Sequence, residues 1–157
     1  MSNNEELINK FYTCFNRKDF KGMQDCYADH AIFNDAIFKN LNADQVRSMW
    51  QMLIVKGKDL SLTFKVTSAK ANLVTAHWDA SYTFSATGRK VTNNIDAFFE
   101  IADGKIVRHT DKFNFYAWSR QAFGLTGVLL GWTGFLHKKV SAQAMKNLEE
   151  YMKNNLA

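Results

Sequence analysis

Apolar residues recur at helical spacing over the first third of the chain. Three stretches each carry one apolar face: Leu7, Ile8, Phe11, Cys14 and Phe15; then Met23, Cys26 and Tyr27; then Val46, Met49, Trp50 and Leu53. A capping pattern precedes each stretch: Ser2 with Glu5 or Asn3 with Glu6, then Asp19, then Asn42 with Gln45. The pattern predicts three helices, with an extended segment at "HAIFNDAIF" between the second and the third.

From Leu60 the period changes to two. Four stretches alternate and are rich in β-branched and aromatic residues: 60–70, 72–87, 90–101 and 105–118. The junctions "ATGRK" and "ADGK" predict hairpin turns, so the strands should form an antiparallel meander. A final stretch, "SAQAMKNLEEYMKNN", predicts an amphipathic helix with Ala144, Met145, Leu148 and Met152 on its apolar side. Helices followed by a meander predict the α+β class, and we expect one domain over residues 1–157.

An uncharged segment, 122–136, separates the last predicted strand from the last helix. It is too short to span a bilayer, and four glycines interrupt it. We expect 122–157 to supply a hydrophobic cover over the sheet or a cavity mouth, followed by the C-terminal helix. A dimer surface and contact with a membrane are the alternatives for 122–136.

The composition adds a high aromatic content to this outline, 14% of the residues, enough to pack a dense core or to line a pocket. The net charge of +5 comes from scattered basic pairs, so we expect no nucleic-acid partner, and we also expect no membrane partner. The N-terminus lacks the features of a signal peptide and the two cysteines are expected to be reduced, which together favour the cytoplasm. No phosphate loop, serine elbow, zinc helix or CxxC pair is present, so neither a cofactor nor a metal is expected.

One predicted strand carries a polar pair on its apolar face. Read with a period of two, "GKIVRHTDKFNF" (104–115) places Val107, His109, Asp111, Phe113 and Phe115 on one face and polar residues on the other. A carboxyl group held in apolar surroundings beside a histidine is suited to general acid or base catalysis. Asp111 and His109 are therefore candidate catalytic residues. The structural alternatives are a surface aspartate paired with a lysine and a hydrogen-bonded core histidine.

The order of the elements, with "YADHAIFND" and "DGKIVRHTDKFNF", resembles the nuclear transport factor 2-like superfamily, and within it the SnoaL-like polyketide cyclases and related proteins of unassigned function. The resemblance covers about residues 4 to 120. It implies a curved antiparallel sheet wrapped around the N-terminal helices, forming a cone with an apolar pocket. It also implies a homodimer formed through the outer face of the sheet.

The resemblance further implies which acids reach the pocket. SnoaL-like cyclases place an acid/base aspartate on the strand after the "DGK" turn, at the position of Asp111. Ketosteroid isomerases use two acids that match Asp35 and Asp96, but their oxyanion-hole tyrosine falls on Phe11, with Tyr12 beside it. Half of that oxyanion hole is therefore expected to be missing. The residues expected to contact a ligand are aromatic, with core packing as their alternative role: Tyr12, Trp50, Trp78, Tyr82, Phe98 and Phe113.

Two further chemistries are not expected. Limonene-epoxide hydrolases need an Arg-x-Asp pair, and Trp78 and Ala80 occupy those positions here. The pairs His77/Asp79 and His109/Asp111 could together bind a metal ion, but the alternation places them on opposite faces of the sheet.

These observations favour a pocket protein that acts on, or binds, a small hydrophobic molecule. As an enzyme it would be a cofactor-free cyclase, isomerase or hydratase with Asp111 as general acid or base and His109 as its partner. The alternative is a non-catalytic module that binds a small ligand or another protein on the same fold.

Overall fold

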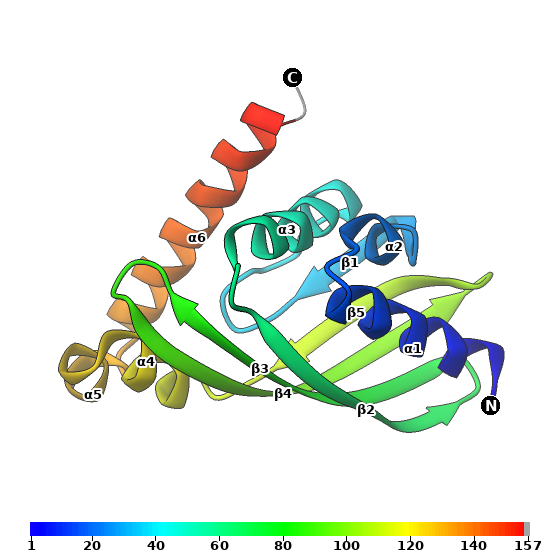
Figure 1. The fold of residues 1–157 in the computed structure, drawn as a ribbon, viewed down its shortest axis with the longest axis horizontal. Coiled ribbons are helices and arrows are strands. Elements are labelled where there is room, and N and C mark those ends of the chain that lie inside the picture. The colour runs from blue at the N-terminus through cyan, green and yellow to red at the C-terminus, as the bar shows by residue number, and fades with distance from the viewer. Residues whose placement is uncertain (156–157) are drawn as a thin grey trace.

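The computed structural model describes residues 1–155 and is of the predicted α+β class (Figure 1). The first half of the chain forms α1 (Asn3–Asn16), α2 (Phe20–Gln24), β1 (Tyr27–Asn34) and α3 (Ala43–Lys56). A meander follows, with β2 (Ser61–Lys70), β3 (Leu73–Phe84), β4 (Arg89–Ala102) and β5 (Lys105–Lys112). The chain then forms α4 (Phe115–Phe123), α5 (Leu125–Leu130) and α6 (Gly134–Asn155).

The sheet is curled and its strand order is β1-β5-β4-β3-β2. Strands β2 to β5 pair antiparallel, as the meander predicts, whereas β1 pairs parallel to β5. The sheet is therefore mixed rather than wholly antiparallel. In Figure 1 helices α1, α2 and α3 lie over its concave face. Because β1 pairs with it, β5 is not an edge strand: it lies between β1 and β4, and its inward side chains have neighbours on both of these strands.

The predicted caps begin the first three helices. Ser2 caps α1 by accepting from the backbone N–H of Glu5 at 3.1 Å, and Asp19 caps α2 through Gly22. Asn42 and Gln45 form a reciprocal capping box at α3, with both hydrogen bonds at 2.9 Å. Each cap supplies acceptors for backbone donors that have no partner within the helix.

The C-terminal part differs from the sequence prediction in two ways. The last strand was expected to reach residue 118, but β5 ends at Lys112 and α4 begins instead. Asn114 ends the strand pattern because its side chain caps α4, accepting from the N–H of Ala117 at 3.0 Å. Helix α6 also starts seven residues earlier than the predicted helix at Ser141. None of the helices in residues 1–155 has the length and apolar content needed to traverse a bilayer.

The faces of β4 and β5 decide which residues reach the interior. On β4 the buried positions are Val91, Asn93, Ile95, Ala97, Phe99 and Ile101. On β5 a bulge interrupts the alternation, because Glu100 pairs with Arg108 and Ile101 with Ile106, leaving Val107 unpaired. Ile106 therefore takes the buried position before His109, and His109 and Asp111 point inward as the alternation predicted.

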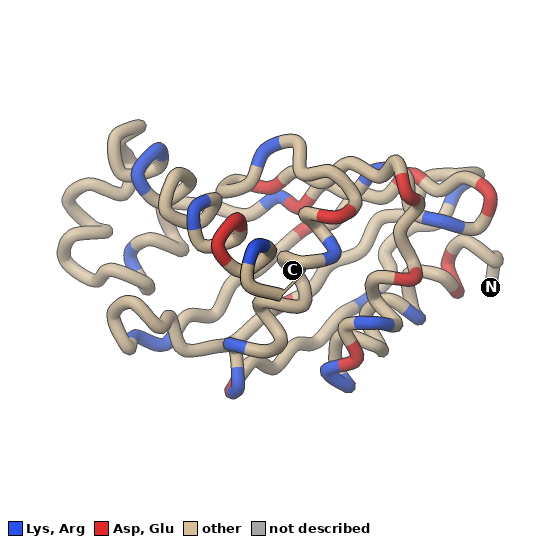
Figure 2. Tube along the Cα trace, turned by 90° about the horizontal axis from the view of Figure 1, so that it is seen from above, with Lys and Arg blue, Asp and Glu red and all other residues tan. Residues whose placement is uncertain are grey.

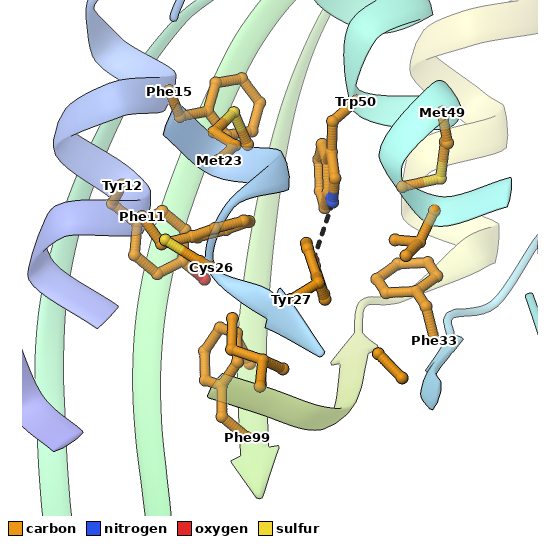
Figure 3. Packing of buried hydrophobic residues seen from close by; sticks show 14 of the residues in the cluster. Phe11, Tyr12, Phe15, Met23, Cys26, Tyr27, Phe33, Met49, Trp50 and Phe99 are labelled. Carbon is orange, nitrogen blue, oxygen red and sulfur yellow. Dashed lines mark hydrogen bonds between the residues drawn. The ribbon is translucent and has the colours of Figure 1, made fainter. Parts of the chain in front are cut away.

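Two hydrophobic clusters fill the interior. The larger lies between the concave face of the sheet and α1 and α3, and it is rich in aromatic rings (Figure 3). The smaller lies between β4 and α4 and is built on Val91, Trp118 and Ala122. Three partly buried side chains, those of Ile37, Tyr82 and Phe113, pack against both clusters and so mark the boundary between them.

Replacing Phe99 by alanine is expected to lower the free energy of unfolding by about 3–5 kcal/mol, because a large buried ring is lost from the core. Phe99 is 2% exposed, and its ring centroid lies 4.1 Å from that of His109. Urea denaturation measures the change. The matched control is Phe98→Ala on the next residue of β4, which is 41% exposed on the outer face and should change stability by no more than about 1 kcal/mol. Equal losses in the two variants would contradict this assignment of faces.

Candidate active site

A chain of hydrogen bonds runs through the larger cluster and ends on Asp111. The indole N–H of Trp50 donates to the hydroxyl oxygen of Tyr27 at 2.9 Å (Figure 3). The Tyr27 hydroxyl lies 2.7 Å from His109 Nδ1, and His109 Nε2 lies 2.8 Å from Asp111 Oδ1. The four residues come from α3, β1 and β5, and none of them is more than 4% exposed.

The donors and acceptors of this chain fit one tautomer of His109. If Nε2 carries the ring proton, Trp50 donates to Tyr27, Tyr27 donates to Nδ1, and Nε2 donates to Asp111. A proton on Nδ1 would instead leave the Tyr27 O–H without an acceptor among the described residues. The network therefore favours the Nε2–H tautomer, which directs a donor at the Asp111 carboxylate.

Aromatic rings enclose His109. Phe33 and Phe11 contact its ring edge to face at centroid distances of 4.9 and 5.7 Å, and Trp50 is stacked parallel to it at 6.1 Å. The rings exclude water from the imidazole and restrict its rotation. The orientation of His109 towards Asp111 is thus fixed both by hydrogen bonds and by packing.

Asp35 lies in the loop after β1 and faces the same region as Asp111. Its Oδ1 accepts from the backbone N–H groups of Ile37 and Phe38, at 2.7 and 2.6 Å. Burial raises the pKa of the Asp35 carboxyl to about 6, and the negative charge of Asp111 contributes to the increase, against the two backbone hydrogen bonds. Asp35 and Asp111, two of the three acids that the sequence singled out, are therefore close enough to interact electrostatically.

Two buried donors next to this region have no acceptor. The hydroxyl of Tyr12 and the indole N–H of Trp78 lack a hydrogen-bond partner in residues 1–155, and the two ring centroids are 6.0 Å apart. Burial raises the pKa of Tyr12 well above its usual value, and the charge of Asp111 adds to the increase. Although Tyr12 follows the expected tyrosine position by one residue, its hydroxyl is within the electrostatic field of Asp111.

The family model of the SnoaL-like domain matches residues 8–109, which is more than half of the chain. The chain belongs to the SnoaL-like family. It thereby has the NTF2-like fold, which it shares with solved structures described as candidate polyketide cyclases. No curated protein matches it significantly.

Solved structures similar to this SnoaL-like chain support the assignment of the fold. A candidate polyketide cyclase from Xanthomonas campestris pv. campestris matches with a TM-score of 0.66 and 21% identity, covering 76% of this chain and 96% of the other. An NTF2-like protein of unknown function from Burkholderia pseudomallei matches with a TM-score of 0.69 and 17% identity, covering 79% and 100%. An LEH-like epoxide hydrolase from M. tuberculosis matches with a TM-score of 0.63 and 14% identity, covering 82% and 96%. At these identities the likeness shows the fold alone.

Asp96 and Phe98 do not lie with the other candidate residues of the SnoaL-like site. Both are exposed on the outer face of the sheet, because the inward positions of β4 fall on the odd-numbered residues around them. The Asp96 carboxylate instead hydrogen-bonds His77 Nδ1 at 2.8 Å, and Asp79 lies 3.2 Å from His77 Nε2. A shallow hollow of about 270 Å³ lies on this face beside Phe98. The homodimer expected through this face stays a prediction.

The remaining ligand-contact candidates differ in how deeply they are buried. Trp50 and Trp78 are buried in the larger cluster, and Tyr82 and Phe113 lie at the boundary between the two clusters. The hydroxyl of Tyr82 accepts from the indole N–H of Trp118 at 2.8 Å, and the charge of Asp35 contributes to a raised pKa of Tyr82.

Residues 1–155 contain no group of three or more His, Cys, Asp or Glu side chains that could hold a metal ion.

Sequence reasoning missed Tyr27, which was assigned to a helical stripe and is instead the first residue of β1. Its role depends on the contact between β1 and β5, which joins Phe33 to His109 across 76 residues of sequence. Periodicity within one segment carries no signal for such a pairing. Trp118 was missed as the partner of Tyr82 for a similar reason, since it lies on α4, where a strand was expected.

The free energy of unfolding is expected to fall as the pH rises from about 4 to about 6. The carboxyl group of Asp35 has a pKa of about 6 in the folded protein, whereas in the unfolded chain it releases its proton near the ordinary aspartate pKa of 3.8. Between about pH 4 and about pH 6 the native state therefore binds more protons than the unfolded state, so it is more stable at the acidic end of this pH range. Urea denaturation at a series of pH values should show that Asp35→Asn removes this part of the pH dependence. An unchanged slope in the variant would contradict the raised pKa.

Asp111→Asn is expected to lower the pKa of Asp35, because the charge of Asp111 is one cause of its increase. A ¹³C NMR titration of the Asp35 carboxyl carbon measures the change. The matched control is Asp96→Asn, which removes a carboxylate from the opposite face and should leave the Asp35 titration unaltered. The same pKa in wild type and Asp111→Asn would mean that the two acids are not coupled.

Proposed function

We propose that this SnoaL-like protein is a cofactor-free cyclase or isomerase that moves a proton on a small hydrophobic carbonyl compound, with Asp111 as the base. The observation that carries the proposal is how the two oxygen atoms of the Asp111 carboxyl group are hydrogen-bonded. Its Oδ1 is bound by His109, whereas Oδ2 accepts no hydrogen bond from residues 1–155, in surroundings that leave the residue 4% exposed. A fixed carboxylate with one free oxygen in an apolar interior suits proton abstraction next to a carbonyl group.

The proposed reaction needs only proton transfers. Asp111 takes a proton from the carbon next to the carbonyl group, and the electron pair of the C–H bond forms an enolate. In an isomerisation the proton returns to a different carbon; in a cyclisation the enolate carbon attacks a second carbonyl of the same molecule, whose oxygen then takes the proton. His109 acts as a positioning residue that donates to Asp111 Oδ1, and Tyr27 and Trp50 hold its ring in place.

Asp35 is the proposed second acid/base group. Its pKa of about 6 is near neutral pH, where a group gives and accepts protons with comparable ease. Asp35 and Asp111 occupy different environments, since one accepts two backbone N–H groups and the other a histidine N–H. Two carboxyl groups with different surroundings allow one to remove a proton while the other returns it.

The developing enolate oxygen requires hydrogen-bond donors, and two are available. The Tyr12 hydroxyl and the Trp78 N–H are buried donors without acceptors, and a buried unpaired polar group is unfavourable by about 1–3 kcal/mol. A carbonyl oxygen of the substrate would satisfy one or both. Because the donors are already desolvated, they would stabilise negative charge on that oxygen more strongly than water does.

Access to the acids depends on the boundary between the two hydrophobic clusters. Ile37, Tyr82 and Phe113 are only partly buried there, while the interior around His109 is filled by rings. The substrate is proposed to enter by displacing these three side chains. Their apolar character is the reason for expecting a hydrophobic substrate.

One observation favours a second function, that of a non-catalytic binding or interaction module. One surface hollow lies on the outer face of the sheet and another beside Asp25, Asp29, His30 and Arg47, and neither of these is lined by Asp111, His109 or Tyr12. A buried His–Asp pair also stabilises a core without performing chemistry.

Wild-type protein is expected to catalyse the exchange of α-hydrogens for deuterium in D₂O on apolar β-diketones and related aromatic polyketide precursors. Asp111→Asn should reduce the exchange rate by about 10²–10⁴-fold, because it removes the general base while keeping the shape of the side chain. NMR or mass spectrometry follows the exchange. Asp96→Asn, on the outer face, is the control and should exchange at the wild-type rate.

The same samples separate the two functions. Loss of exchange in Asp111→Asn, with compound binding preserved by calorimetry, supports the acid/base role. Binding without exchange in the wild type would exclude it in favour of a binding module. Exchange that persists unchanged in Asp111→Asn would assign the base to another residue.

A further inference from the structure

Helix α5 presents its large apolar side chains to solvent and its small residues to the protein. Within the apolar tip, which we define as residues 124–135, the exposed large apolar side chains are Leu125, Val128, Leu129, Leu130, Trp132 and Phe135. Gly127 and Gly131 are buried, four residues apart on the inner side. This is the reverse of an ordinary surface helix, whose apolar stripe faces the core.

The glycines show that this outward orientation is built into the packing. A Cβ atom on Gly127 would collide with the carbonyl oxygen of Ser119, and one on Gly131 would collide with the Ser119 hydroxyl. Only residues without a side chain allow α5 to lie this closely against α4. The inner side of the tip is therefore filled by atoms of α4, which are backbone atoms at Gly127 and the Ser119 and Tyr116 side chains at Gly131, and no large side chain of the tip can turn inward at these positions.

Two polar side chains of the tip, those of Trp132 and Thr133, have their hydrogen-bond acceptors within the tip. The indole N–H of Trp132 donates to the carbonyl oxygen of Leu129 at 3.0 Å, and the Thr133 hydroxyl donates to that of Leu130 at 2.6 Å. Transfer of the Trp132 ring to an apolar environment would leave no donor unpaired. Trp132 is 75% exposed, whereas the other three tryptophans are at most 6% exposed.

The net positive charge of the chain is concentrated in the same part of the molecule. Residues 112–148 contain five basic residues and no acidic one, while the rest of the chain contains fifteen of each, so this segment accounts for the whole net charge of +5. Four basic side chains come from elements that adjoin the tip and are exposed: Arg89, Arg120, Lys138 and Lys139. Figure 2 shows basic positions and no acidic ones at this end of the molecule.

We propose that the apolar tip inserts into the surface of an anionic lipid bilayer. An interfacial segment needs exposed aromatic and leucine side chains bordered by basic residues, and this end of the molecule has both. At six residues, α5 is far too short to span the bilayer, so the contact is with the headgroup region. The proposal departs from the expectation, drawn from the sequence, of no membrane partner, and it is independent of the proposed catalysis.

Charge argues against a second copy of the chain as the occupant. A symmetric contact between two tips would bring the same basic residues of both copies together, with no acidic residue in 112–148 to compensate them. An anionic surface instead gains a favourable interaction from each of these side chains.

The test is co-sedimentation with vesicles of phosphatidylcholine containing phosphatidylserine, compared with vesicles of phosphatidylcholine alone. The protein should bind the anionic vesicles, release with added salt, and show a blue shift in the fluorescence of Trp132. Leu125→Ser/Leu129→Ser should abolish binding while retaining Trp132 as the reporter. Lys138→Gln/Lys139→Gln should weaken it about 30-fold at low ionic strength. The matched control is Leu73→Ser, an exposed leucine on β3, which should bind as wild type.

Three results would overturn the proposal. The first is the absence of binding to anionic vesicles. The second is equal binding by wild type and Leu125→Ser/Leu129→Ser. The third is self-association, measured by sedimentation velocity, that depends on the tip leucines in a protein that does not bind vesicles; that result would assign the tip to a second copy.

Discussion

A carboxylate and an imidazole lie inside an interior built mainly of apolar and aromatic side chains, and this constraint governs much of the structure. From the indole nitrogen of Trp50 to Asp111 Oδ1, each polar side-chain atom of this network has a hydrogen-bond partner, and Asp111 Oδ2 is the one atom of the network that accepts no hydrogen bond from residues 1–155. A buried polar network of this kind is favourable only when it is complete, because each missing partner leaves a desolvated group unpaired. Trp50, Tyr27 and His109 therefore act as a unit, and the one acceptor of the network that remains free is Oδ2 of Asp111.

This requirement explains several features of the fold. Tyr27 reaches His109 because β1 pairs with β5 in parallel, which brings the start of the first strand beside the end of the meander. Trp50 reaches Tyr27 because the capping box fixes where α3 begins, and hence which residues face the sheet. The bulge at Val107 restores the phase of β5 so that Ile106, His109 and Asp111 are all buried. Local signals set each element, and the hydrogen bonds join elements far apart in the sequence.

Local chemistry in the sequence was enough to predict some of this. The caps of α1 to α3, the inward face of His109 and Asp111, and the outward face of His77 and Asp79 follow from residue spacing alone. Asp96 and Phe98 were harder to place, because "NNIDAFFEI" has apolar residues on both faces and the alternation does not choose between them. The helix at α4 was missed because "FNFYAW" is aromatic and alternating, although the cap at Asn114 overrides that pattern. The partners Tyr27 and Trp118 depend on tertiary contacts that no local pattern encodes.

The C-terminal segment gives this SnoaL-like chain features that the family match does not cover. The matched region ends at His109, whereas Asp111, the boundary residue Phe113 and helices α4 to α6 follow it. His137, near the start of α6, bonds the carbonyl oxygen of Ala36 and stacks on Phe115 at a centroid distance of 4.3 Å. The same helix thus begins beside the apolar tip and holds the loop that carries Asp35. Residues 113–137 therefore lie next to the loop that carries Asp35, and relatives that share only the fold up to His109 need not share the side chains around the two acids.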